Sequence, residues 1–409
     1  MDMNAVGLTP RRERLLLWTL AGVQFTHILD FMIMMPLGPQ FIALFGISNA
    51  EFGLLVSFYT LAAGASGLLA TTYIDRFGRK RLLVTLYGLF GLATLACGLA
   101  PDYASLLAAR VAAGVFGGVL SALTQTIVAD AIPFERRGRA MGVVMTSFSV
   151  STVAGVPLGL WLAAHWNWHV PFVGIAAMVA VLALLAAWTM PRLDAHVHHP
   201  DRTSVWSGIA QVLSQPSHWR AFAFTSGMMF TGFMVIPYIT IYLQFNAGVL
   251  AHEVPWMYLL GGVGTLISAR WIGRLSDRLG KVWVFQRLAL AVTVPLVLTT
   301  VSAGLPLWGL FSISSALFVL MSGRMIPGMA LVASTAEPRL RGTFLSMNVS
   351  VQSASMGVAA LISGLLVGRD AQGQLTGYWL VGLLGVSASL LTWWLAPRLM
   401  VAVSARSAQ

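Results

Sequence analysis

The stretch that decides the fold is the short polar loop Asp75-Arg76-Phe77-Gly78-Arg79-Lys80-Arg81. It follows an apolar run near residues 51–73, and a related loop follows a later apolar run, with the sequence Gly273-Arg274-Leu275-Ser276-Asp277-Arg278-Leu279-Gly280-Lys281. A second pair of loops recurs two runs further along, as Glu135-Arg136-Arg137-Gly138-Arg139 and Pro338-Arg339-Leu340-Arg341-Gly342. Two loop motifs at corresponding places indicate that the chain consists of two related halves.

The segments around these loops are apolar enough to lie in a membrane. The chain has 409 residues, of which 57% are hydrophobic and only 10% charged, whereas soluble domains carry about a quarter charged residues. Apolar runs of about 18 or more residues can cross roughly 30 Å of hydrocarbon as helices. We therefore predict an all-α integral membrane protein with twelve transmembrane helices in two pseudo-symmetric six-helix bundles. The predicted spans are 15–38, 51–73, 80–100, 104–129, 140–163, 168–190, 219–245, 254–273, 282–303, 306–333, 343–367 and 376–396.

The longest polar stretch divides the chain into an N-terminal bundle (1–190), a cytoplasmic linker (191–218) and a C-terminal bundle (219–409). Apolar residues from Val205 to Leu213 recur at helical spacing, which indicates a short helix within the linker. The linker also contains Asp194, His196, His198, His199 and Asp201. Their spacing fixes no metal geometry, so we expect a solvated tether, with no metal and no cofactor.

The basic residues fall in alternate loops, and the opposite loops offer only Arg369. By the positive-inside rule, the basic loops are cytoplasmic, which places both termini inside and requires an even number of spans. The same distribution accounts for the net charge of +11 without a nucleic-acid partner. We expect a multi-pass monomer of the bacterial inner membrane.

An acidic-basic-x-Gly-basic loop, repeated in both halves, resembles the signature loop of the major facilitator superfamily, in particular its bacterial drug and sugar efflux proton antiporters. The resemblance covers essentially the whole chain. It implies a secondary transporter that works by alternating access, in which loop charges lock the cytoplasmic side. That lock would comprise Asp75, Arg79 and Asp130, with Asp277 and Arg278 forming a weaker counterpart in the second half.

One further feature departs from this resemblance, and another fits it. The family has a glycine where this chain has Thr71, whose hydroxyl can bond back to its own helix. In the fifth span, Gly155, Pro157 and Gly159 are similar to a shortened form of the glycine-proline motif of family antiporters. Glycines allow close helix packing, and the proline removes a backbone hydrogen bond.

Charged groups within the spans are the strongest functional candidates, because each is costly in lipid. Asp30 is predicted about eight residues from the outer end of the first span, and Arg110 about six residues from that of the fourth. The resemblance makes the first, fourth, seventh and tenth helices the walls of the central cavity, so we expect Asp30 and Arg110 to pair there and, with His27 one turn away, to couple transport to protons. The alternative is a static structural pair.

Polar residues elsewhere in the spans are predicted to line the substrate cavity. They are Gln24, Tyr238, Tyr242, Asn246, Arg324, Asn348 and Gln352. The alternative is hydrogen bonding between helices, and for Arg324 a bond to carbonyls freed near Pro327.

The preferred function is proton-coupled efflux of a small hydrophobic or neutral molecule, with protons and the lipid bilayer as the other partners. The alternative is an uptake symporter or facilitator of the same fold. A protein of another functional class, such as an intramembrane enzyme or a sensor, is a further alternative. The sequence contains no HExxH or GxSxG motif that would support enzymatic activity.

Overall fold

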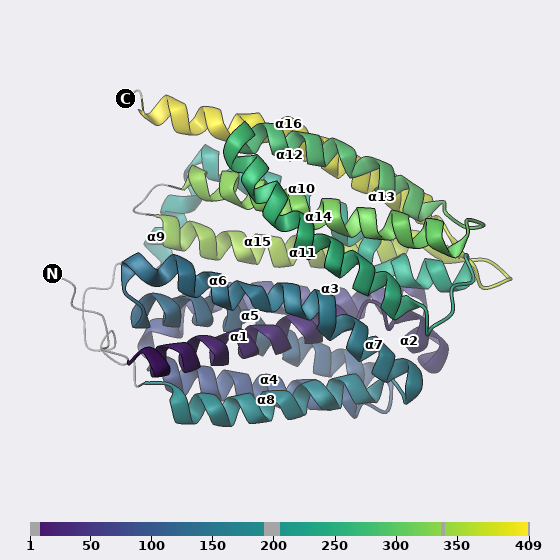
Figure 1. Cartoon of the computed structure of the whole chain (residues 1–409), viewed down its shortest axis with the longest axis horizontal. Helices are drawn as coiled ribbons and strands as arrows, with labels where there is room; N and C mark the ends of the chain where they lie inside the picture. The colour runs from purple at the N-terminus through teal and green to yellow at the C-terminus, as the bar shows by residue number, and fades with distance from the viewer. Residues whose placement is uncertain (1–8, 192–204, 337–339, 408–409) are drawn as a thin grey trace. The chain divides into compact units, whose positions relative to one another are not determined.

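The computed structural model describes residues 9–191, 205–336 and 340–407, which form two compact units. The first unit comprises Met1–Ile33 and Phe58–Thr203, and the second comprises Met34–Ser57 and Ser204–Gln409. Both consist almost entirely of helices (Figure 1). The helix α3 (Asn49–Tyr73) contributes its first residues to the second unit and the rest to the first. The predicted division at the linker stays a prediction.

The first unit is a bundle of long helices. In chain order its other elements are α1 (Pro10–Ile33), η1 (Ile74–Arg76), α4 (Arg79–Gly98), α5 (Tyr103–Ala131), α6 (Phe134–Val150), η2 (Ser151–Gly155), α7 (Val156–His165) and α8 (His169–Thr189). Helix α4 packs between α5 and α8, and α1 packs against α5, α6 and α8. At the end of α3, the Thr71 hydroxyl donates to the carbonyl of Leu68 at 2.7 Å, as predicted.

Small residues bring α5 unusually close to α3. A Cβ on Gly114 would lie 2.3 Å from the carbonyl oxygen of Tyr59, and a Cβ on Gly118 would lie 2.3 Å from that of Ala63. The two glycines are one turn apart on one face of α5, which is the spacing that lets membrane helices approach closely. No larger side chain fits at either position without separating the two backbones.

The glycine-proline motif makes a similar contact with α1. Cβ atoms on Gly155 and Gly159 would lie 3.0 and 2.7 Å from the side chains of Leu29 and Ile33. Just before Pro157 the helix widens into the π-helical turn η2, a local change that is common where a helix is interrupted. The motif therefore packs against the turn of α1 that contains Asp30.

The end of α1 differs from the prediction. The first span was expected to reach residue 38, but α1 ends at Ile33 and a turn over 34–37 leads into the short helix α2 (Gly38–Phe45). Pro36 explains the difference, since a proline disfavours helical geometry in the residue before it. Asp30 thus lies three residues from the end of α1, nearer to the end of its helix than the predicted eight residues.

The second unit contains α2, the start of α3 and the C-terminal half of the chain. Its remaining elements are α9 (Val205–Leu213), α10 (Pro216–Phe245), α11 (Val254–Leu279), α12 (Lys281–Ala291), α13 (Thr293–Thr300), α14 (Leu307–Thr335), α15 (Arg341–Leu366), the hairpin of β1 (Gly368–Arg369) and β2 (Leu375–Thr376), and α16 (Tyr378–Ser407). Helix α10 is central and packs against α14, α15 and α16.

Within this unit, the segment Met34–Ser57 is fastened to α10 and α15. The Asn49 amide donates to the carbonyls of Val367 and Gly368 at 3.1 and 3.2 Å, and the Ser57 hydroxyl donates to that of Gly357 at 2.7 Å. The Tyr238 hydroxyl donates to the Asn49 carbonyl at 3.1 Å. We call this set of contacts the strap.

In the described part of the chain, eleven helical segments are long and apolar enough to cross a membrane. The predicted span outside these eleven is the eighth, 254–273, which corresponds to α11. Its 26 residues are long enough, but its apolar stretch is interrupted by Arg270 and Arg274. Arg270 falls inside the predicted span 254–273 and is exposed, a charge that the sequence analysis overlooked. The twelve-helix count is consistent with the structure.

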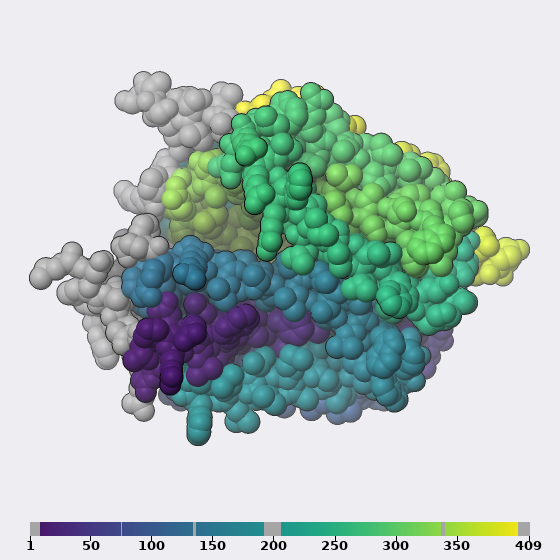
Figure 2. Space-filling view, in the orientation of Figure 1, coloured from purple at the N-terminus to yellow at the C-terminus, as the bar shows by residue number. Residues whose placement is uncertain are grey.

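The outer surface fits contact with lipid. Along α8, the teal helix at the lower edge of Figures 1 and 2, Val181, Leu184 and Trp188 are 66%, 73% and 92% exposed. Such a continuous apolar face would be a liability in water. In a bilayer it lies against acyl chains.

The predicted linker helix is present as α9. The ring nitrogen Nδ1 of His218 lies 2.9 Å from the carbonyl of Val212, and Trp219 Nε1 donates to that of Leu213 at 2.8 Å, so both side chains satisfy carbonyls at the end of α9. The residues Asp194, His196, His198, His199 and Asp201 lie outside the described residues.

The close approach of α3 and α5 requires a glycine at position 114, and this requirement can be tested. We expect Gly114→Ala to destabilise the protein by about 1–3 kcal/mol, because even one methyl group must push the Tyr59 backbone away. Gly88→Ala in α4 is the matched control, since a Cβ there meets no described atom within 4 Å. Thermal unfolding in detergent measures both, and equal midpoints for the two variants would contradict the packing described.

Candidate functional site

The candidate site is a buried ion pair in the first unit. Arg110 Nη1 on α5 donates to Asp30 Oδ2 on α1 at 2.9 Å, and both side chains are 0% exposed. The same nitrogen lies 3.4 Å from the backbone oxygen of Asp30. Removing one partner of a buried pair leaves an uncompensated charge, which typically costs about 3–5 kcal/mol. Each of the two charges therefore depends on the other.

An aromatic ring holds the other side of the guanidinium. The Cζ atom of Arg110 lies 4.1 Å from the centroid of the Tyr59 ring, well within the range of a cation–π interaction. Gly114, one turn after Arg110 on α5, sets this distance because it lets the Tyr59 backbone press against α5. The sequence analysis missed Tyr59, since nothing in its spacing distinguishes it from the many other aromatic residues in the spans.

The pair leaves much of its hydrogen-bonding capacity unused. Several buried atoms around it have no hydrogen-bond partner among the described residues: Asp30 Oδ1, Arg110 Nε and Nη2, His27 Nδ1, and the hydroxyls of Tyr59 and Thr94. Buried polar groups are normally paired, so a cluster of exceptions requires an explanation. The contact between Asp30 and Arg110 itself uses only one carboxylate oxygen and one guanidinium nitrogen.

Two more residues adjoin the pair. His27, one turn before Asp30 on α1, is partly exposed and meets the Phe90 ring edge-on at 5.8 Å. A Cβ on Gly117 would lie 3.1 Å from both His27 Nε2 and the Tyr59 hydroxyl oxygen, so the glycine leaves space between them. Cys97 on α4 lies beside Arg110.

The predicted cytoplasmic lock is seen in part. Arg79 Nε donates to Asp130 Oδ2 at 2.9 Å, with the arginine only 4% exposed, and Arg79 Nη1 donates to the Ile74 carbonyl at 2.7 Å. The Asp75 side chain lies outside the described residues. Asp277 and Arg278 are exposed and make no ion pair with any described residue.

Arg324, predicted to meet substrate, is 1% exposed and joins helices. Its Nη2 donates to the carbonyl of Met228 on α10 at 2.7 Å, and Nη1 lies 3.4 Å from the Ser389 hydroxyl on α16. The acceptor comes from a neighbouring helix and not from a carbonyl near Pro327, so that alternative was wrong in its detail. A direct role with substrate stays a prediction.

The remaining cavity candidates are occupied by contacts within their own unit. Gln24 accepts from Ser121 at 3.1 Å, and Asn348 accepts from Thr225 at 2.8 Å. Tyr238 belongs to the strap, while the Tyr242 hydroxyl accepts from the backbone N–H of Ala303 at 3.0 Å. These four contacts fit the alternative of hydrogen bonding inside the bundle.

Two further cavity candidates are half-buried in the second unit. Asn246 bonds both backbone groups of Leu375, at 2.9 and 2.8 Å, and so anchors the β1–β2 hairpin. Gln352 lies 3.7 Å from the sulfur of Met329. No contact described here assigns either residue to a substrate.

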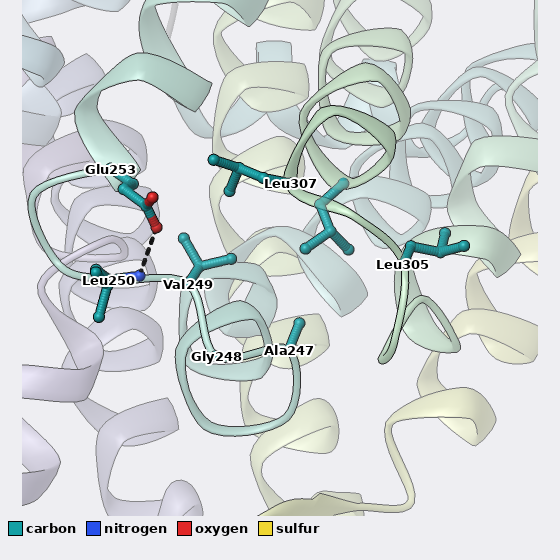
Figure 3. A pocket seen from close by; sticks show the side chains of 8 residues that line it. Ala247, Gly248, Val249, Leu250, Glu253, Leu305 and Leu307 are labelled. Atoms are coloured by element: carbon teal, nitrogen blue, oxygen red, sulfur yellow. Dashed lines mark hydrogen bonds between the residues drawn. The ribbon is translucent and has the colours of Figure 1, made fainter.

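An open hollow of about 310 Å³ also lies in the second unit, around the ends of α10 and α14 (Figure 3). It is lined mainly by aliphatic residues and by Glu253, whose carboxylate accepts from the backbone N–H of Leu250 at 2.8 Å. The one acid of this hollow is thus engaged in a local turn, and the hollow contains none of the predicted site residues.

Comparison with known proteins agrees with this architecture. Residues 20–320 match the sequence profile of the Major Facilitator Superfamily. The uncharacterized MFS-type transporter YceJ of Bacillus subtilis is 25% identical over 373 residues, which cover 88% of this chain and 92% of the relative. A chloramphenicol efflux pump of Mycobacterium tuberculosis is 26% identical over 235 residues, covering 58% of this chain and 56% of the pump.

Solved structures share the fold. The nucleoside transporter NupG, in a mutant form, matches with a TM-score of 0.75 at 13% identity, covering 95% of this chain and 99% of that chain. A bacterial homologue of the human lysosomal transporter Spinster, in an inward-facing and unoccupied conformation, matches with a TM-score of 0.71 at 17% identity and covers 97% of this chain and 96% of that one. The predicted all-helical membrane fold is confirmed, and the chain belongs to the Major Facilitator Superfamily of membrane transporters.

Proposed function

We propose that this transporter exports a small hydrophobic or neutral molecule in exchange for protons, by alternating access. The observation that carries the proposal is the fully buried Asp30–Arg110 pair with its unsatisfied atoms. An ionisable group inside a membrane span is expensive, and its presence favours a function that uses its charge.

The proton step follows from the geometry of the carboxylate. Asp30 Oδ2 is engaged by Arg110, whereas Oδ1 has no described partner. A proton that binds Oδ1 forms an O–H bond and neutralises the carboxylate, while Arg110 keeps its charge. The pair then carries one net positive charge in place of zero. Burial penalises the ionised carboxylate and Arg110 stabilises it, so a change in their separation selects which form is favoured.

His27 fits a role in carrying protons to this site. It is partly exposed while Asp30 is fully buried, and the two side chains are three residues apart on α1, on one helical face. A partly exposed imidazole beside a buried carboxylate can exchange protons with water and with the acid.

Efflux is favoured over uptake by two observations. The glycine-proline motif of the fifth span is similar to that of family antiporters, and it packs against Leu29 and Ile33, which flank Asp30 on α1. One relative is a chloramphenicol efflux pump, and chloramphenicol is a neutral molecule. An uptake symporter or a facilitator of the same fold remains the alternative.

The strap supports alternating access. The segment Met34–Ser57 is continuous in sequence with α1 and the rest of α3, which belong to the first unit, yet it is packed within the second. We propose that these contacts within the second unit must break during the transport cycle. We also propose that the protein is a monomer of the bacterial inner membrane with both termini in the cytoplasm, as its basic loops indicate.

The first prediction distinguishes a proton-coupling role of the Asp30–Arg110 pair from a purely structural one. We expect Asp30→Asn to abolish accumulation of chloramphenicol driven by a pH gradient in vesicles, while downhill exchange survives. Arg110→Ala is expected to impair both and to lower stability, because it leaves a buried carboxylate unpaired. Radiolabelled uptake into inverted vesicles, with and without an imposed pH gradient, provides the measurement.

Asp102→Asn is the matched control for Asp30→Asn. Asp102 caps α5 from outside the span by accepting from the backbone N–H of Ser105 at 2.8 Å. That bond holds the pKa of Asp102 below its ordinary value, and asparagine caps helices about as well. If Asp30→Asn accumulates substrate as fully as Asp102→Asn under a pH gradient, Asp30 does not couple transport to protons. The facilitator alternative is then favoured.

The second prediction concerns the lock. We expect Asp130→Asn to slow transport and to raise the labelling, by thiol probes, of a cysteine introduced at the cytoplasmic side, because the nearly buried Arg79 loses one charged partner. The charge swap of Arg79→Asp with Asp130→Arg should recover part of the loss. If Asp130→Asn transports normally and labelling is unchanged, these charges only set topology.

The third prediction concerns the strap. Cysteines replacing Asn49 and Val367, whose side chain and carbonyl are now bonded, should react with a short bifunctional thiol reagent. We expect the cross-linked protein to stop transporting, while each single variant treated with the same reagent continues. The native Cys97 is buried and is retained throughout. Normal transport by the cross-linked protein would show that the strap never opens.

A further inference from the structure

Arg110 has two partners of different kinds, and only one of them can lose its charge. The carboxylate of Asp30 on α1 is ionisable, whereas the Tyr59 ring on α3 offers the guanidinium the negative face of its π-system, 4.1 Å away. Tyr59 is itself 2% exposed. Arg110 is therefore buried between a carboxylate, whose charge a proton neutralises, and an aromatic ring, which a proton leaves unchanged.

The Tyr59 ring is held by contacts with α5 and with α1. The Tyr59 backbone is pressed against Gly114, one turn from Arg110 on the same helix. This contact ties ring and guanidinium together through α3 and α5, without involving α1. The ring of Phe31 also stacks on Tyr59, with centroids 5.4 Å apart. A change in α1 or in Asp30 would leave the α3–α5 contact in place.

We propose that Tyr59 is a positioning residue that keeps the Arg110 guanidinium in place when Asp30 takes up a proton. This inference rests on the proton-coupled function proposed above and deepens it. On protonation, the proton bonds to Asp30 Oδ1, the carboxyl becomes neutral and the charge of Arg110 loses its counter-ion. The ring then stabilises the buried cation that remains, which makes protonation less costly.

The effect has a definite sign. Without the ring, Arg110 depends on the carboxylate alone, so the ionised form of Asp30 is retained to lower pH. The other titratable groups that face the pair are His27 from α1 and Cys97 from α4, along with the Tyr59 hydroxyl itself. Substitutions at position 59 leave His27 and Cys97 unchanged, and Tyr59→Phe shows the effect of losing the hydroxyl alone.

Ring and hydroxyl can be separated. The hydroxyl has no hydrogen-bond partner among the described residues, and its oxygen would lie 3.1 Å from a Cβ on Gly117. Tyr59→Phe therefore keeps the proposed function of the ring and removes only the hydroxyl, whereas Tyr59→Leu removes the ring.

The test is a pH titration of the purified protein in proteoliposomes by infrared difference spectroscopy, with the proton as the only ligand. The carboxyl band that disappears in Asp30→Asn is assigned to Asp30. We expect Tyr59→Phe to titrate as the unmodified protein does and Tyr59→Leu to reach half-protonation at lower pH, by on the order of one pH unit. Tyr87→Leu is the control, since Tyr87 is an equally buried aromatic that bonds Thr26 at 2.8 Å; we expect it to leave the midpoint unchanged.

Fluorinated phenylalanines at position 59 provide a second measurement that preserves volume and guards against a Tyr59→Leu protein that does not fold. Each added fluorine weakens the negative face of the ring, so the midpoint should fall stepwise. An unchanged midpoint in Tyr59→Leu, or across the fluorinated series, would overturn the role of Tyr59 while leaving proton coupling intact. If no band is lost in Asp30→Asn, the proposed function itself fails.

Discussion

The structure of the first unit depends on one constraint, that a charge buried in a membrane bundle must be paired. Asp30 and Arg110 meet at 2.9 Å with no exposed surface, so α1 and α5 are held in one relative position for as long as both groups are charged. A neutral hydrogen bond would impose a weaker condition. Because the condition is removed by a single proton, the same contact that stabilises the bundle also gives it a means of responding to a proton gradient.

Glycines provide the geometry that makes this pair work. Gly114 and Gly118 bring α3 against α5 and place the Tyr59 ring on Arg110, while Gly155 and Gly159 seat the fifth span on the turn of α1 that bears Asp30. In each case a missing side chain lets a backbone approach, and the approach positions a functional group. The motifs that resemble family signatures thus act on the ion pair through packing.

Much of this was predictable, and the reasons for the rest are physical. Hydrophobic length gave the spans, and the repeated loop at Asp75 and Asp277 gave the family. The cost of charge in lipid marked Asp30 and Arg110 as candidates, and the family resemblance, which places the first and fourth helices at one cavity, predicted that they pair. The end of α1 was misplaced because hydropathy continues past Pro36 although helical geometry does not. The contact of Tyr59 with Arg110, the contacts of the strap and the hydrogen bonds of Arg324 depend on three-dimensional packing that no local sequence pattern encodes.

The central claim is that the Asp30–Arg110 pair couples transport to protons, and the most direct test is the movement of protons itself. Proteoliposomes loaded with a pH-sensitive dye would receive a gradient of a neutral compound that the protein is shown to transport, such as chloramphenicol, with no pH gradient imposed. The account predicts that substrate flow in one direction drives protons in the other, and that Asp30→Asn moves substrate downhill with no change in internal pH. Substrate flow without any proton movement in the unmodified protein would contradict it.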